Sequence, residues 1–166
     1  FPGWQKMVAF LSSASILSYG IGPICLLALR KIQPEQRRPF KLLGSLFFCN
    51  IAFYVCNLML YWCGFSVIWK LCLAILFGFI IYLCYQKRNF WSGNYSLYWF
   101  FSYITVLLLL SYLGPFGGIA RLKFPFGMLI IFPFSLLMLY LSQYCLVRDQ
   151  AEKESFDLMN KQLQDL

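Results

Sequence analysis

The sequence contains no histidine, and only six of its 166 residues are acidic. One of these is Glu35 and the other five follow Val147, so no carboxylate lies within a long apolar run. A general base, or a carboxylate pair acting inside a membrane, would need such groups. We therefore expect no enzyme, no catalytic residue, no metal site and no cofactor.

Other kinds of site are also missing. The seven cysteines lie in or at the ends of apolar runs and form no Cys-x-x-Cys pair, which argues against zinc ligation and against a disulfide framework. No glycine-rich phosphate loop is present. The basic residues gather at the ends of apolar runs, where membrane orientation alone requires them, so we expect no nucleic-acid partner.

Apolar and aromatic residues are abundant instead. They make up 61% and 20% of the chain, whereas 12% of the residues are charged. This composition predicts a polytopic membrane protein in contact with lipid. About 20 mostly apolar residues cross a bilayer as a helix, and continuous runs without alternation favour helices over barrel strands. We expect an all-α membrane helical bundle with about five transmembrane helices, at residues 1–31, 42–63, 65–85, 95–113 and 124–147.

Basic residues predict the orientation of these helices, because cytoplasmic loops collect Lys and Arg. The link at residues 32–41 is strongly basic, and Lys87 and Arg88 follow the third helix. We expect both links to be cytoplasmic, with the N-terminus of this chain outside and the C-terminus inside. Lys70 would then extend toward the outer interface as an anchor.

The last segment, residues 148–166, is polar, with three basic and five acidic residues. Its apolar residues Phe156, Met159 and Leu163 recur at helical spacing. Two interpretations remain open: a short amphipathic helix at the cytoplasmic surface, or a frayed polar terminus.

The first apolar run carries a small, polar face. Ser12, Ser15, Tyr19 and Gly22 follow helical spacing, and such a stripe either packs against other helices or borders a wet pathway. Proline at position 23 frees a backbone carbonyl one turn earlier. We expect a kink near residues 20–23, as either a passive bend or part of a gate.

The second run has a comparable face. Cys49, Cys56 and Cys63 are spaced by seven residues, and so are Asn50 and Asn57 beside them. This spacing places small and polar side chains along one side of a helix. It predicts close helix packing or hydrogen bonds between helices.

The start of the chain has neither an initiating methionine nor the features of a signal peptide. We expect the chain to be the C-terminal portion of a longer protein.

Several motifs resemble one transporter superfamily. The residues Leu-Ser-Tyr-Gly-Ile-Gly-Pro-Ile at 17–24, Ala-Leu-Arg at 28–30 and Arg-Pro-Phe at 38–40 resemble the end of the transport core in the amino acid, polyamine and organocation (APC) superfamily. Looser similarities lie at residues 61–64, 81–84 and 111–114. The pattern is most similar to the bacterial aspartate and proton symporter branch.

The resemblance implies the C-terminal part of a LeuT-like (APC) fold in the bacterial inner membrane. Residues 1–31 would be the last core helix and residues 42–147 four accessory helices. The missing N-terminal part of the same transporter would hold the amino acid substrate. The full protein would then be a proton-coupled amino acid symporter.

The resemblance also implies roles for particular residues. Vestibule and gate candidates are Ser15, Ser18, Tyr19, Gly20, Gly22 and Pro23. Position 20 is glycine where relatives often carry alanine, which should loosen the bend. Accessory helices often form dimer contacts in such families, so a homodimer is also open. The alternative function is a non-transporting membrane interaction or scaffold protein.

Overall fold

A computed structural model describes residues 3–37, 43–85, 95–122 and 125–164, and every regular element within these ranges is a helix. Each helix is long and apolar enough to cross a membrane. The predicted polytopic all-α bundle is thus confirmed. The helices are α1 (Trp4–Ile32), α2 (Ser45–Cys63), α3 (Phe65–Tyr85), α4 (Tyr95–Leu113) and α5 (Phe126–Gln164).

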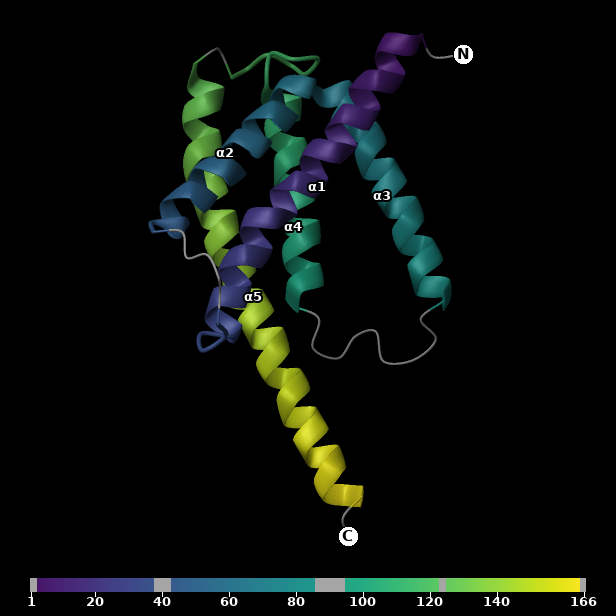
Figure 1. Cartoon of the computed structure of the whole chain (residues 1–166). Coiled ribbons are helices and arrows are strands. Elements are labelled where there is room, and N and C mark those ends of the chain that lie inside the picture. Colours follow the sequence, from purple (N-terminus) through teal and green to yellow (C-terminus); the bar gives the residue numbers. More distant parts are fainter. Residues whose placement is uncertain (1–2, 38–42, 86–94, 123–124, 165–166) are drawn as a thin grey trace.

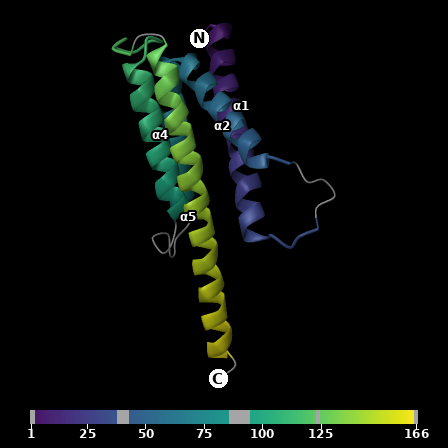
Figure 2. The same cartoon turned by 90° about the vertical axis from the view of Figure 1, so that its left-hand side faces the viewer.

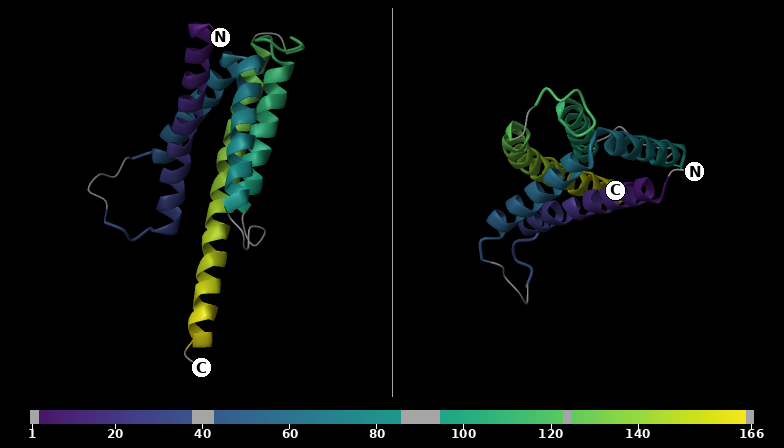
Figure 3. Two further views of the ribbon diagram at one scale, coloured as in Figure 1. Left: turned by 90° about the vertical axis from the view of Figure 1, so that its right-hand side faces the viewer. Right: turned by 90° about the horizontal axis from the view of Figure 1, so that it is seen from above.

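Successive helices run in opposite directions, so the two termini lie at opposite ends of the bundle (Figure 1). The most extensive contact joins α1 and α2, and α2 also packs on α5. Helices α4 and α5 lie side by side (Figure 2). Helix α3 stands at the edge (Figure 3) and buries only Ile68 and Leu71.

The core lies where the helices meet, and all five contribute to it. Because lipid tails are as apolar as these side chains, helices in a membrane associate mainly through close packing and hydrogen bonds. The core accordingly includes small and polar residues beside the large apolar ones. Its buried apolar cluster consists of Ile24, Leu27, Cys49, Phe53, Leu60, Leu71, Tyr103, Leu107, Phe134, Met138 and Leu139.

Gly64 alone separates α2 from α3, as the sequence predicts. Its φ of +85° is a conformation that side chains rarely adopt. A Cβ at this position would also lie 2.7 Å from the carbonyl oxygen of Phe116. That oxygen accepts a 2.9 Å hydrogen bond from the backbone N–H of Phe65, so the α4–α5 link fastens the start of α3.

Helix α1 is continuous from Trp4 to Ile32 and contains Pro23. Proline removes one hydrogen-bond donor, and a membrane helix tolerates this loss when neighbouring groups compensate. The predicted weak point near residues 20–23 therefore does not interrupt the helix. A bend there during function stays a prediction.

Helix α5 is the main departure from the sequence-based boundaries. We predicted a membrane helix ending at residue 147 and a separate tail at 148–166, but α5 runs unbroken to Gln164. Residues 148–164 are thus helical and continue α5 directly. At about 1.5 Å per residue, its 39 residues span roughly 58 Å, well beyond a hydrocarbon core of about 30 Å. The change in composition marks where the helix leaves the apolar zone, and α5 projects past the other helices (Figure 1).

The predicted basic loop is described only in part. Helix α1 includes residue 32, residues 33–37 follow it, and the remainder up to residue 41 lies outside the described residues. The second helix begins at Ser45 rather than at residue 42. Lys87 and Arg88 also lie outside the described residues.

Candidate functional site

The small, polar side chains of the first helix lie on its open side. We define the α1 polar face as Ser12, Ser15, Ser18, Tyr19 and Gly22, all of which are exposed. The ring of Tyr19 is 72% exposed. In contrast, Ile24 and Leu27 lie in the bundle core. The described part of the chain therefore packs against one side of α1 and leaves the polar face uncovered.

Two of the serine hydroxyls on this face, those of Ser15 and Ser18, donate within their own helix. Ser15 Oγ donates to the carbonyl of Leu11 at 3.1 Å, and Ser18 Oγ donates to that of Ala14 at 3.1 Å. Each hydroxyl oxygen keeps its acceptor capacity, and hydroxyl rotation leaves it able to donate elsewhere. Both hydroxyls therefore have a partner within the helix and can still form a hydrogen bond with a polar group that approaches this face.

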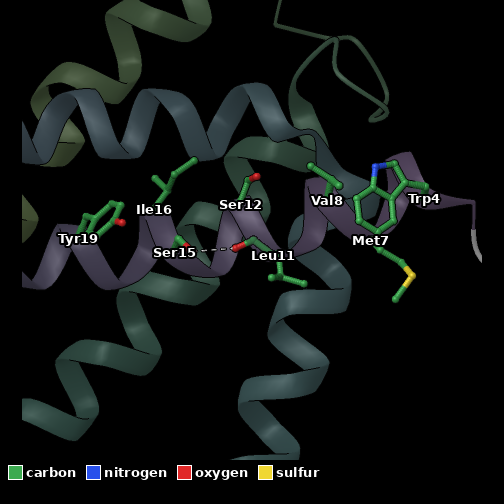
Figure 4. Close-up of a pocket in the computed structure, with 8 residues that line it drawn as sticks. All are labelled: Trp4, Met7, Val8, Leu11, Ser12, Ser15, Ile16 and Tyr19. Carbon is green, nitrogen blue, oxygen red and sulfur yellow. Dashed lines mark hydrogen bonds between the residues drawn. The ribbon is translucent and has the colours of Figure 1, made fainter.

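An open depression of about 640 Å³ covers the N-terminal half of this face. All its described lining residues come from α1, so it is the surface of one helix rather than a cavity enclosed by several. Its polar side-chain groups are the Ser12 and Ser15 hydroxyls, the Tyr19 phenol and the Trp4 indole N–H. Its lining residues, drawn in Figure 4, are Trp4, Met7, Val8, Leu11, Ser12, Ser15, Ile16 and Tyr19.

The structure divides the six predicted gate residues between two sides of α1. Ser15, Ser18, Tyr19 and Gly22 are exposed on the polar face. Pro23 is half-buried.

Gly20, by contrast, is buried and faces α2. A Cβ there would lie 3.8 Å from both Phe53 and Cys56, which is ordinary contact. Alanine would therefore fit at position 20. Glycine here belongs to the α1–α2 contact, not to the open face.

A hydrogen-bonded network joins three helices inside the bundle. Tyr103 Oη of α4 donates to Asn57 Oδ1 of α2 at 2.6 Å, and Asn57 Nδ2 donates to Ser135 Oγ of α5 at 3.1 Å. All three residues are buried. The predicted bonds between helices are confirmed for Asn57, whereas Asn50 donates within its own helix, to the carbonyl of Leu46.

The sequence analysis did not single out the partners in this network. Ser135 and Ser142 are spaced by seven residues, which is the kind of repeat that drew attention to Asn57, so a signal for Ser135 was present. Tyr103 lies among several other polar residues of α4, and only the packing of the helices identifies it.

Asp149 is a further residue whose role the sequence did not reveal. Its carboxylate accepts the backbone N–H groups of Tyr95 at 2.8 Å and Ser96 at 2.9 Å, and also the Ser96 hydroxyl. These donors start α4, where the helix dipole favours negative charge. Asp149 thus fastens the start of α4 to α5. Elsewhere, no three metal-ligating side chains gather among the described residues.

No family model matches the chain, and neither does any solved structure. Two bacterial transporters do resemble it, both from Bacillus subtilis (strain 168). The chain is 31% identical over 156 residues to the aspartate-proton symporter, and this match covers 87% of this chain and 29% of that protein. It is also 31% identical over 143 residues to the glutamate/serine transporter AimA, covering 82% of this chain and 26% of that protein.

The chain therefore spans less than a third of the length of either protein that it matches. The predicted similarity to an aspartate and proton symporter is confirmed at the level of sequence. Over most of its length, the chain is a relative of these bacterial amino acid transporters.

Proposed function

We propose that the chain is the C-terminal part of a secondary amino acid transporter, in which α1 lines the permeation route and α2 to α5 support it. One observation carries the proposal: a chain related to two amino acid transporters leaves the polar face of a membrane helix uncovered. The other side of this helix packs on α2 and α5.

The character of the α1 polar face supports this role. Small and hydroxyl-bearing stripes in membrane helices either pack closely against other helices or border water. The helices of the described chain occupy the opposite side of α1, so the face points away from the bundle. In the proposed transporter, Ser15, Ser18 and Tyr19 form part of a vestibule wall, and the segment with Gly22 and Pro23 bends as the gate moves.

Substrate binding and coupling are assigned to other segments of the proposed transporter. The described spans offer no free carboxylate in their middle for a proton, because Asp149 is bound to the start of α4 and Glu152 is the last residue of the fifth span. We propose proton-coupled symport of an amino acid by the whole protein, with a LeuT-like core of the APC type and no enzymatic activity. A homodimer through the accessory helices remains part of the proposal.

The distribution of basic residues supports an orientation in the bacterial inner membrane. Lys6 and Lys70 lie in the first turns of α1 and α3, and Arg121 lies in the α4–α5 link at the same end (Figure 1). Arg30, Lys31 and Arg37 lie at or just after the end of α1, and Arg148 follows on α5 at that side. The more basic end is assigned to the cytoplasm. This puts the N-terminus of the chain outside and its C-terminus inside.

Uptake by proteoliposomes tests the function. Vesicles holding the full-length protein, with and without an inward proton gradient, would be given radiolabelled aspartate, glutamate, serine and leucine. Gradient-dependent uptake of at least one amino acid is expected. If none accumulates above protein-free vesicles, while the reconstituted protein is folded, the transport proposal fails and an interaction or scaffold role takes its place.

Cysteine labelling tests the position of α1 separately. In a full-length protein whose native cysteines are replaced, Ser15→Cys and Ser18→Cys should react with a membrane-impermeant maleimide, and saturating substrate should change the rate. The matched control is Ser13→Cys, because Ser13 is fully buried on the same helix. Equal, substrate-independent rates at all three positions would contradict a vestibule wall.

A further inference from the structure

The face of α5 near the end of α1 combines cations and tyrosines. Tyr140, Tyr144 and Arg148 are spaced by four residues, so they share one side of the helix. The tyrosines are 68% and 58% exposed, and Arg148 is exposed as well. Lys31 of α1 places its Nζ 6.0 Å from the centre of the Tyr140 ring. We call these four residues the tyrosine surface.

Its cations are held in place by uncharged groups. Arg148 Nη1 makes a long, 3.5 Å contact as donor to Tyr144 Oη, and its guanidinium lies 4.3 Å from the centre of the Tyr95 ring. Aromatic faces attract a cation without neutralising it. Both cations of the tyrosine surface therefore keep their charge for another partner.

The nearby carboxylates leave this charge largely uncompensated. Asp149 turns to the N–H groups that start α4. Glu152 is exposed one turn beyond Arg148. Among the carboxylates whose side chains the structure describes, Glu35, Asp149 and Glu152, none forms an ion pair with Lys31 or Arg148. An anion approaching between the two cations thus meets a net positive field.

The same side of α5 is apolar on the turns before Tyr140. Four large apolar side chains are exposed there, and the row that they form extends toward the middle of the membrane span. We call this row the apolar column, and it consists of Leu129, Phe132, Leu136 and Leu137. The complete surface is therefore amphiphilic along the membrane normal, with hydrocarbon first, then phenols, then cations.

We propose that the tyrosine surface binds an anionic phospholipid, with the phosphate between Lys31 and Arg148. The tyrosine hydroxyls donate to phosphate or glycerol oxygens, and the acyl chains lie along the apolar column. Charge complementarity selects an anionic headgroup, and the apolar column selects a lipid over a soluble anion. The inference requires membrane insertion only and does not rest on transport.

Native mass spectrometry of the purified full-length protein tests the site. Detergent-solubilised protein would be titrated with phosphatidylglycerol, and separately with phosphatidylcholine of the same chains. Preference for phosphatidylglycerol is expected. Since each basic residue near an anionic surface contributes about 1 kcal/mol, Lys31→Gln and Arg148→Gln should each weaken its binding about fivefold, and the double variant roughly 25-fold.

Lys6→Gln combined with Lys70→Gln is the matched control, since both are exposed lysines at the other end of the bundle. This control should bind phosphatidylglycerol like the wild type. Because Arg148 also contacts Tyr95, a thermal melt checks folding, and if that variant melts early Lys31→Gln alone decides the test.

Three outcomes would overturn the proposal. The first is a double variant that binds phosphatidylglycerol as tightly as the wild type, and the second is an equal loss in the control. In the third, glycerol 1-phosphate binds as tightly as the lipid, which would indicate a soluble-anion site.

Discussion

Replacing Asn57 by alanine should destabilise the helical bundle by about 2 to 4 kcal/mol. The substitution removes two hydrogen bonds that join α2 to α4 and α5. Such bonds contribute on average about 0.6 kcal/mol each in membrane proteins. It also leaves the buried Tyr103 hydroxyl without its acceptor, which adds about 1 to 3 kcal/mol. Ser135 Oγ still donates to the carbonyl of Ile131, so no second buried donor is orphaned.

Reversible unfolding in mixed micelles with increasing SDS, followed by circular dichroism, measures this loss. Asn50→Ala is the matched control, because Asn50 donates only to Leu46 in its own helix and is half-buried. It should change the free energy of unfolding by less than about 0.5 kcal/mol. Tyr103→Phe should cost about 1 to 2 kcal/mol, since it removes one bond and leaves the Asn57 carbonyl oxygen unpaired.

A double-mutant cycle separates the bond itself from other effects of the substitutions. If Asn57 and Tyr103 interact as the 2.6 Å distance indicates, Asn57→Ala and Tyr103→Phe together should cost about 1 kcal/mol less than the sum of the two. Strict additivity would refute the interaction. So would an Asn57→Ala variant as stable as Asn50→Ala.

Three further substitutions test other contacts. Gly127→Ala should cost about 1 to 3 kcal/mol in the same unfolding assay, because its Cβ would lie 2.3 Å from Tyr61 Oη. Tyr61→Phe in that background should restore part of the loss, whereas Gly78→Ala, with open space around it, should be neutral or stabilising. Asp149→Ala should lower the free energy of unfolding by about 1 to 2 kcal/mol and also the melting temperature, because the first N–H groups of α4 lose their acceptor. An unchanged melting temperature would contradict that role. Gly20→Ala should leave the free energy of unfolding and the amino acid uptake near the wild-type values, because the new methyl group makes only 3.8 Å contacts. A large loss of uptake with intact folding would show instead that movement of α1 needs glycine at this position.

The membrane class, the number of helices and the turn at Gly64 followed from the sequence alone. These features depend on local properties, because a run of about 20 apolar residues must form a helix that satisfies its own backbone in lipid. The hydrogen-bonding role of Asn57 was also predicted, since the spacing by seven places it on one helix face. The position of the α1 polar face followed from helical spacing in the same way.

Only the tertiary structure decided the partners of these faces. Tyr103, Ser135 and Asp149 meet their partners across 46 to 78 positions of sequence, and no local pattern encodes such a pairing. The length of α5 beyond residue 147 also came from the structure, because hydropathy reports where a helix leaves lipid and not where its backbone hydrogen bonds stop. The resemblance implied a gate role for Gly20 together with its neighbours, and only the structure shows that Gly20 is buried against α2.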